Sequence, residues 1–185
     1  MSIAAEVSIA APVDRVWHAL RDRAELRRWH GWEAESLDAE IEEIYFAQAV
    51  ADDEKRTLTT SGTRIEVSEG TRVTFTMTLP PDDPMWEGWY QTVVDGWVAF
   101  AQQLRFALER HPGEERTTVY LEGAQQRDVA GAVGDRYETA GLTGTVWFRT
   151  ERLLGLTVDS WGDGLLVLMP DGAVLTAYGT TPELG

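Results

Sequence analysis

Three histidines, His18, His30 and His111, are the side chains best able to exchange a proton near neutral pH. His18 stands beside a tryptophan on a predicted helix, where a surface position is favoured. His111 ends a long predicted helix, where a cation opposes the helix dipole. His30 lies in the loop 29–32, between two tryptophans, and is the histidine retained as a functional candidate. None of the three has the i, i+4 spacing of a metal-binding pair.

Several classes of chemistry are excluded by residues that the sequence lacks. It has no cysteine, so disulfides, thiolate nucleophiles and zinc–thiolate sites are impossible. No Gly-x-Ser-x-Gly elbow and no phosphate-binding glycine loop occur, and 162–164 is typical of a turn. No metal or cofactor is therefore expected.

The net charge limits the kinds of partner that the protein is expected to bind. A net charge of −15 argues against binding nucleic acid or an anionic membrane surface. No apolar run reaches the ~20 residues of a membrane helix, and no signal peptide is visible, so a cytoplasmic protein is expected.

Six acidic residues crowd the segment 33–43. Their spacing does not match an EF-hand loop, which favours a solvated loop and the start of a strand over a calcium site. They are Glu33, Glu35, Asp38, Glu40, Glu42 and Glu43.

One long helix dominates the predicted architecture. Asp83 and Pro84 supply an N-cap and a first helical residue, and Pro112-Gly113 ends the helix. Its apolar residues recur every three or four positions and so form one stripe, which requires a large apolar partner surface. The stripe comprises Val93, Trp97, Phe100, Leu104 and Leu108.

The segments before this helix predict a sheet that could cover it. Alternating apolar residues at 63–69 and 72–79 indicate antiparallel strands with one covered face. Further elements are predicted as a strand at 2–10, a helix from Pro12, a short helix at 23–28, and strands at 44–50 and 55–60.

Residues 114–185 carry a second pattern. Strands are predicted at 117–122, 145–151, 153–158, 165–169 and 173–178, and a weak helix at 128–137. Strand, helix and several strands repeat the order of the first part without its long helix. We therefore expect two domains, 1–113 and 114–185, the second a β-rich partial copy that packs on the first sheet or completes it.

This order of elements resembles the START-like superfamily, also called SRPBCC or the helix-grip fold. The segments VSIAAPVDRVWHALRDRAELRRWHGWEAE (7–35) and DGWVAFAQQLRFALE (95–109) resemble the opening and the closing helix of the branch related to the activator of Hsp90 ATPase. The resemblance covers residues 3–111. It implies an α+β fold in which an antiparallel sheet wraps the long helix.

The resemblance also implies an apolar cavity between sheet and helix that holds a hydrophobic small molecule. Plain core packing of the same aromatic residues is the competing interpretation. Phe75 and Met77 are expected to face the helix. Trp29, Trp32 and Tyr45 are expected near the mouth of the cavity. The candidate ligand-binding residues are Trp29, His30, Trp32, Tyr45, Phe75, Met77, Trp89, Val93, Trp97 and Phe100.

Other functions remain open on the same resemblance. Relatives include cyclases and aromatases of polyketides, for which Arg64, His30, Tyr45 and Asp95 are the polar candidates, although Asp95 is expected to face solvent. Some members confer self-resistance to an antibiotic. A chaperone-associated interaction module is a further alternative, and a protein partner or a homodimer is compatible with each. A non-enzymatic ligand-binding protein is favoured.

Overall fold

A computed structural model describes residues 1–60, 62–79, 83, 88–123 and 129–179. Contacts divide the chain into two compact units, one of residues 1–31 and 35–113, the other of residues 32–34 and 114–185. Within the described ranges, no helix is both long and apolar enough to cross a membrane.

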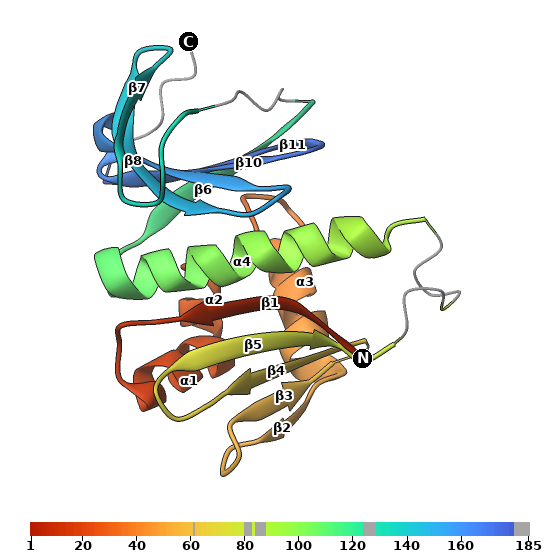
Figure 1. The fold of residues 1–185 in the computed structure, drawn as a ribbon. Helices are drawn as coiled ribbons and strands as arrows, with labels where there is room; N and C mark the ends of the chain where they lie inside the picture. Colours follow the sequence, from red (N-terminus) through yellow and green to blue (C-terminus); the bar gives the residue numbers. More distant parts are fainter. Residues whose placement is uncertain (61, 80–82, 84–87, 124–128, 180–185) are drawn as a thin grey trace. The chain divides into compact units, whose positions relative to one another are not determined.

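The first unit is a five-stranded antiparallel sheet with the long helix α4 packed along it (Figure 1). The strand order is β1-β5-β4-β3-β2. In chain order its elements are β1 Ser2–Ser8, α1 Val13–Arg21, α2 Arg23–Arg27, α3 Leu37–Glu42, the π-helix η1 Glu43–Ala47, β2 Val50–Asp52, β3 Thr57–Thr59, β4 Thr63–Val67, β5 Arg72–Met77 and α4 Tyr90–Arg110.

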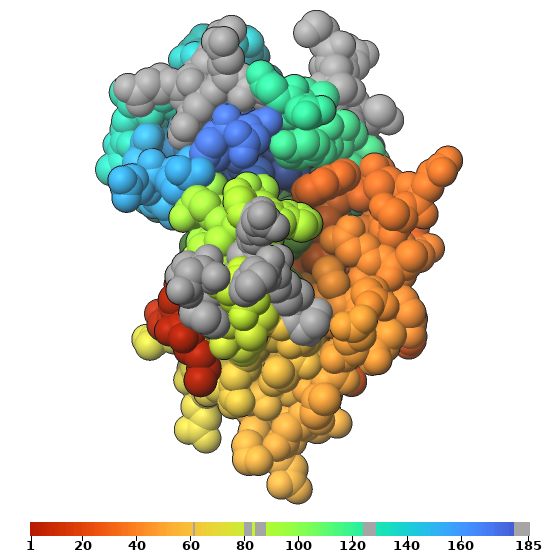
Figure 2. Space-filling view, turned by 90° about the vertical axis from the view of Figure 1, so that its right-hand side faces the viewer, coloured from red at the N-terminus to blue at the C-terminus, as the bar shows by residue number. Residues whose placement is uncertain are grey.

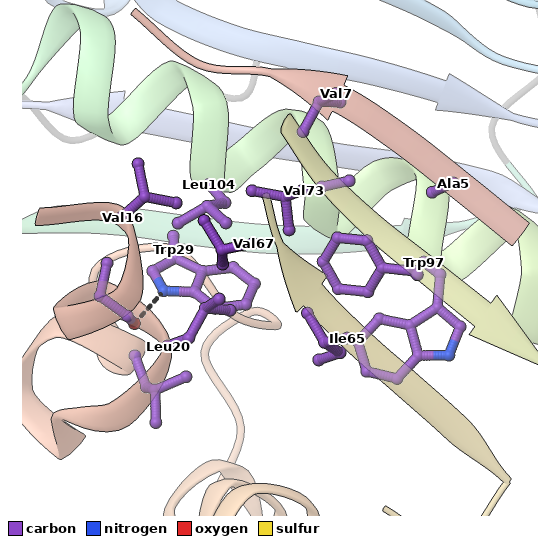
Figure 3. Close-up of a cluster of buried hydrophobic side chains, with 14 of the residues drawn as sticks. Ala5, Val7, Val16, Leu20, Trp29, Ile65, Val67, Val73, Trp97 and Leu104 are labelled. Atoms are coloured by element: carbon purple, nitrogen blue, oxygen red, sulfur yellow. Dashed lines mark hydrogen bonds between the residues drawn. The ribbon is translucent and has the colours of Figure 1, made fainter. Parts of the chain in front are cut away.

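The alternation of the two best-predicted strands explains where the core lies. β4 and β5 pair so that Ile65 lies opposite Phe75 and Val67 opposite Val73. All four side chains are buried, whereas Glu66 between them is exposed. This places one apolar face of the sheet against the helix, as period-two alternation requires. Figure 3 shows Trp97 of α4 beside Ile65 of this face.

The short helices close one side of this core. α1 buries Val16, Ala19 and Leu20 at helical spacing. Trp29, which follows α2, donates a hydrogen bond of 2.8 Å from its indole Nε1 to the carbonyl oxygen of Ala19 (Figure 3). Because its ring is buried and its indole nitrogen is hydrogen-bonded, Trp29 anchors the short helices to the core.

An ion-pair cluster fixes α1 to α2. Glu25 is largely buried and binds Arg15 at 2.6 Å and Arg28 at 2.7 Å through its two carboxylate oxygens. The backbone N–H of Glu25 is bound by the side chain of Asp22, the N-cap residue of α2. The two helices are therefore joined at their start by charge as well as by packing.

The acidic segment differs from the sequence-based expectation. Instead of a loop and a strand at 44–50, residues 37–47 form α3 and η1, and only Val50–Asp52 is strand. Leu37, Ile41 and Tyr45 are buried at steps of four, while the carboxylates between them are exposed. Figure 2 shows this part of the chain, in orange, at the surface. Helical periodicity thus outweighs the β propensity of the run 44–46.

The long helix begins later than predicted. It starts at Tyr90, with Trp89 as its N-cap residue, and ends at Arg110. The predicted first turn at 84–87 lies outside the described residues. The apolar stripe that the spacing predicts is present, since Trp97, Leu104 and Leu108 belong to the buried core of the first unit.

The second unit is a six-stranded antiparallel sheet in the order β6-β11-β10-β9-β8-β7. The predicted helix at 128–137 is absent from its described part, where β7 stands instead, as the two glycines inside that segment favour. Its elements are β6 Arg116–Glu122, β7 Arg136–Thr139, β8 Leu142–Arg149, β9 Leu154–Val158, the 3-10 helix η3 Asp159–Trp161, β10 Gly164–Met169 and β11 Gly172–Tyr178.

The expected fold class is confirmed by these two sheets. The protein is α+β, its long helix packs on an antiparallel sheet, and the C-terminal extension has a large antiparallel sheet of its own. Among the described strands, the six strands of the second sheet are hydrogen-bonded only to one another. The extension therefore adds no strand to the first sheet.

A three-residue segment from the first half of the chain belongs to the second unit. Residues 32–34 lie against β6, where the N–H of Glu33 donates to the carbonyl oxygen of Thr118 at 2.8 Å. The ring of Trp32 stacks on Tyr120 with centroids 4.7 Å apart. Trp32 therefore packs within the second unit.

Candidate functional site

A continuous series of aromatic rings crosses the first unit from the sheet to the short helices. Phe75 of β5 lies 5.1 Å from Trp97 of α4, and Trp97 lies 6.1 Å from Phe100 on the same helix. Phe100 lies 4.6 Å from His30, which lies 5.1 Å from Tyr45 of η1. We call these five residues and Trp29 the aromatic cluster.

Two more predicted residues join or border this cluster. Trp29 meets His30 and Tyr45 edge-on, with centroid distances of 5.7 and 5.9 Å. Met77 is fully buried one strand position beyond Phe75 on the same face, and its sulfur receives a long contact from the Thr63 hydroxyl. Edge-on ring contacts of this kind add to the free energy gained by burial.

His30 connects the aromatic cluster to a polar chain of three residues. Its side chain is fully buried. Nδ1 lies 3.0 Å from the hydroxyl of Tyr45, and Nε2 lies 3.0 Å from Oε1 of Glu40, a residue of α3. Glu40 is partly exposed, so the chain leads from the buried tyrosine to the surface.

The direction of the hydrogen bonds in this chain follows from the acidities of its ends. Burial, together with the nearby Glu40 carboxylate, raises the pKa of Tyr45 well above its usual value of 10.0, so the hydroxyl stays protonated. The hydrogen bond from His30 lowers the pKa of Glu40, which keeps that carboxylate ionised at neutral pH. Tyr45 therefore donates to Nδ1, and the Nε2–H of His30 donates to Glu40.

The helical segments that carry this chain have an unusual geometry. Tyr45 lies in the single π-helical turn Glu43–Ala47 that directly continues α3. Such turns are rare and occur often at functional sites. The turn lets Glu40 and Tyr45, five residues apart, bind the two ring nitrogens of one histidine.

The loop that carries His30 ends at a glycine for a steric reason. Gly31 has φ of +65°, and a Cβ there would lie 2.9 Å from Leu37 Cδ1. Its carbonyl oxygen accepts a hydrogen bond of 3.2 Å from Nε2 of Gln103 on α4. The loop is thus fastened to the long helix next to Phe100.

Burial along α4 changes from one end to the other. Ala101 and Leu104, in the second half of the helix, are fully buried. Tyr90, Val93 and Phe100, in the first half, are only partly buried although they pack against the same core. The apolar face of the helix is therefore accessible only towards its N-terminal half.

The remaining predicted site residues lie elsewhere. Trp89 is 59% exposed. Trp32 belongs to the second unit, as described above. The structure thus brings together seven of the ten candidates in or beside the aromatic cluster, and Val93 lies at its accessible end, packed against the same core.

Of the polar candidates for catalysis, Tyr45 contacts His30, whereas Arg64 and Asp95 bind residues of their own elements. Arg64 pairs with Glu66 on the same strand at 3.2 Å. Asp95, expected to face solvent, is instead 4% exposed and accepts a hydrogen bond from Gln91. His18 is exposed, as predicted, whereas His111 is buried at the end of α4.

Comparison with known proteins gives one match. The family model described as Activator of Hsp90 ATPase homolog 1-like protein matches residues 10–133. The matched range includes α1 to α4 and β2 to β6, and so contains every member of the aromatic cluster. No curated protein and no solved structure matches the chain.

Proposed function

Because the chain belongs to the family described as Activator of Hsp90 ATPase homolog 1-like protein, we propose that its first unit binds a hydrophobic small molecule between α4 and the sheet. The observation that carries the proposal is the gradient of burial on α4. Apolar residues of the first half, Val93 and Phe100 among them, stay partly exposed beside the aromatic cluster. A ligand that covered them would gain about 25 cal/mol for each Å² of apolar surface removed from water.

The aromatic cluster supplies the wall for such a ligand. Small-molecule sites are mostly apolar with a few placed polar groups. Phe100 is partly exposed and contacts the ring of His30, whose polar partners are Tyr45 and Glu40. A ligand at the accessible end of α4 would therefore meet aromatic surface first and a hydrogen-bonded histidine behind it.

The geometry gives less support to an enzyme of the cyclase type. A general base needs a free nitrogen within hydrogen-bond reach of the substrate. Both ring nitrogens of His30 are already engaged, and the side chain is fully buried. Arg64 and Asp95, two of the other polar candidates, bind residues of their own elements.

A dye-binding experiment with one matched pair of variants tests the proposal. The neutral apolar dye Nile red is titrated into the full chain, and native mass spectrometry of freshly purified protein reports any retained ligand. We expect dye uptake that Val93→Asp abolishes, because a carboxylate would occupy the accessible apolar face. Val133→Asp is the control, since Val133 is 60% exposed in the second unit. A clean apo mass together with no dye uptake would refute the proposal.

The description of the family favours a second candidate, a protein that acts on a chaperone ATPase. A pull-down with the full chain, followed by an ATPase assay of any chaperone recovered, tests it. Stimulation that persists in Val93→Asp would separate this activity from ligand binding. Recovery of no chaperone would remove the second candidate.

A further inference from the structure

One flank of α4 has a gap where a side chain would fit. Val93, Gly96, Phe100 and Gln103 follow at steps of three and four and so share one flank of the helix. Among the residues that the structure describes, a Cβ on Gly96 would have no heavy atom within 4 Å outside its own stretch of helix. We call these four residues the Gly96 flank.

A glycine at this position lowers the stability of the helix. Glycine inside a helix is less favourable than alanine, because it loses more backbone freedom on folding. Neighbouring atoms give no steric reason for glycine, since the space beside it is open. An absent side chain instead leaves the backbone of α4 accessible between Val93 and Phe100, which are themselves partly exposed.

The inner end of the same flank holds a buried acceptor. Gln103 is 2% exposed. Its Nε2 donates to the carbonyl oxygen of Gly31, which fixes the orientation of the amide, since a flipped amide would set two acceptors against each other. Oε1 is buried and accepts no hydrogen bond from any group that the structure describes. A buried acceptor of this kind is stabilised by a donor.

From these two observations we infer that the Gly96 flank is the seat of the ligand, and that the ligand is an uncharged apolar molecule carrying one hydroxyl or N–H group. The inference rests on the proposed function. The apolar body lies against the bare backbone at Gly96 and against the ring of Phe100. The hydroxyl or N–H donates to Oε1 of Gln103. A fatty acid is disfavoured, because an ionised carboxylate has no hydrogen to donate and the chain carries a net charge of −15.

Two naphthalene probes test the donor requirement on the full chain. 1-Naphthol and 1-methoxynaphthalene share their ring system, but only the first can donate a hydrogen bond. Isothermal titration calorimetry is expected to give about fivefold tighter binding for 1-naphthol, the effect of one ordinary hydrogen bond. Gln103→Leu is expected to remove this preference. Gln102→Leu is the control: it removes another buried Oε1 on α4 that accepts no described hydrogen bond, but it lies off the Gly96 flank and is expected to keep the preference.

A series of substitutions at Gly96 tests the seat. Gly96→Ala is expected to raise the melting temperature by about 2 °C, from helix propensity, and to weaken 1-naphthol binding. Gly96→Leu is expected to fold and to bind neither probe, because its side chain would fill the gap. This series tests whether the ligand lies at the Gly96 flank even if Gln103→Leu does not fold.

The outcomes separate this inference from the function on which it rests. If neither probe nor Nile red binds, the proposed function itself fails. If the probes bind but Gly96→Leu leaves their affinity unchanged, the seat is wrong while the function stands. Equal affinities of the two probes for the unmodified chain, as expected if water alone occupies the site at Gln103, would overturn the donor requirement.

Discussion

The hydroxyl of Tyr45 lies 3.0 Å from Nδ1 of His30, and both side chains are completely buried. Because the ionised Glu40 carboxylate can only accept, the Nε2–H of His30 donates to it, and Nδ1 of the neutral ring then accepts from the Tyr45 hydroxyl. The imidazole ring is therefore held on both sides, by the Tyr45 hydroxyl and by the Glu40 carboxylate.

Tyr45→Phe removes this hydroxyl and leaves a buried ring nitrogen without its donor. We expect the free energy of unfolding to fall by about 1–3 kcal/mol. Urea denaturation followed by tryptophan fluorescence measures the change. Tyr90→Phe serves as the control, since the Tyr90 hydroxyl binds Ser2 at an exposed position, and its effect is expected to stay below about 0.5 kcal/mol. Equal effects of the two variants would contradict the importance of the Tyr45 hydroxyl.

Glu40 predicts a dependence of stability on pH. Its pKa is lowered in the folded protein by the hydrogen bond from His30, so the folded state holds the carboxylate ionised more strongly than the unfolded chain does. The resulting stabilisation is complete above the unfolded pKa and is lost as the pH falls through the folded pKa. The stability difference between the unmodified chain and Glu40→Gln should therefore be largest near pH 7 and shrink below about pH 4.

A matched carboxylate outside the network provides the control for this titration. Glu42 lies on the same helix and forms an exposed pair with Arg23. Glu42→Gln is expected to change stability by less than about 0.5 kcal/mol across the range from pH 7 to pH 3. A Glu40→Gln difference that grows on acidification would contradict the assigned direction of the pKa shift.

Glu25→Gln is expected to loosen α1 from α2. The neutral side chain cannot neutralise Arg15 and Arg28, both of which are partly buried. Removing one partner from a largely buried charge cluster costs about 2 kcal/mol or more. Chemical denaturation at pH 7 measures the loss, with Glu42→Gln again as the exposed counterpart. A loss no larger than that of the counterpart would show that packing alone joins the helices.

Gly144→Ala is expected to destabilise the second sheet. A Cβ at this position would lie 1.9 Å from the backbone oxygen of Thr157, on the neighbouring strand. The strands would have to separate, which costs about 1–3 kcal/mol or more. Amide hydrogen exchange across β8 and β9 measures the effect locally, and β4 and β5 of the first unit are expected to keep their protection. Unchanged exchange in β8 and β9 would contradict the close approach.

Sequence patterns predicted those elements whose period is clear. The alternation of Val73, Phe75 and Met77 predicted β5 and its buried face, and the spacing from Val93 to Leu108 predicted the stripe of α4. The segment 44–50 was predicted as a strand because its aromatic and β-branched residues favour one. The competing signal, Leu37, Ile41 and Tyr45 at steps of four, spans the acidic run, where charge drew the prediction towards a loop.

The candidate site could be predicted in its apolar part better than in its polar part. Trp29, His30, Tyr45, Phe75, Trp97 and Phe100 were identified by type and by the resemblance to a family. Glu40 was missed, because the acidic run 33–43 was predicted as a solvated loop and strand start, not as the helix α3 that carries Glu40. Gln103 and Gly96 were missed as well. What marks them is the missing donor at Oε1 of Gln103 and the open space beside Gly96, and neither can be seen in a sequence.

The pairing of Glu33 with Thr118 has a consequence for the order in which the protein is made. Residues 32–34 leave the ribosome some eighty residues before β6, the strand that receives them. The peptide groups of this short segment lack their partners on β6 while α3, η1, β2 to β5 and α4 are synthesised. The second unit thus includes a short segment made early, and its contacts are not completed by the C-terminal residues alone.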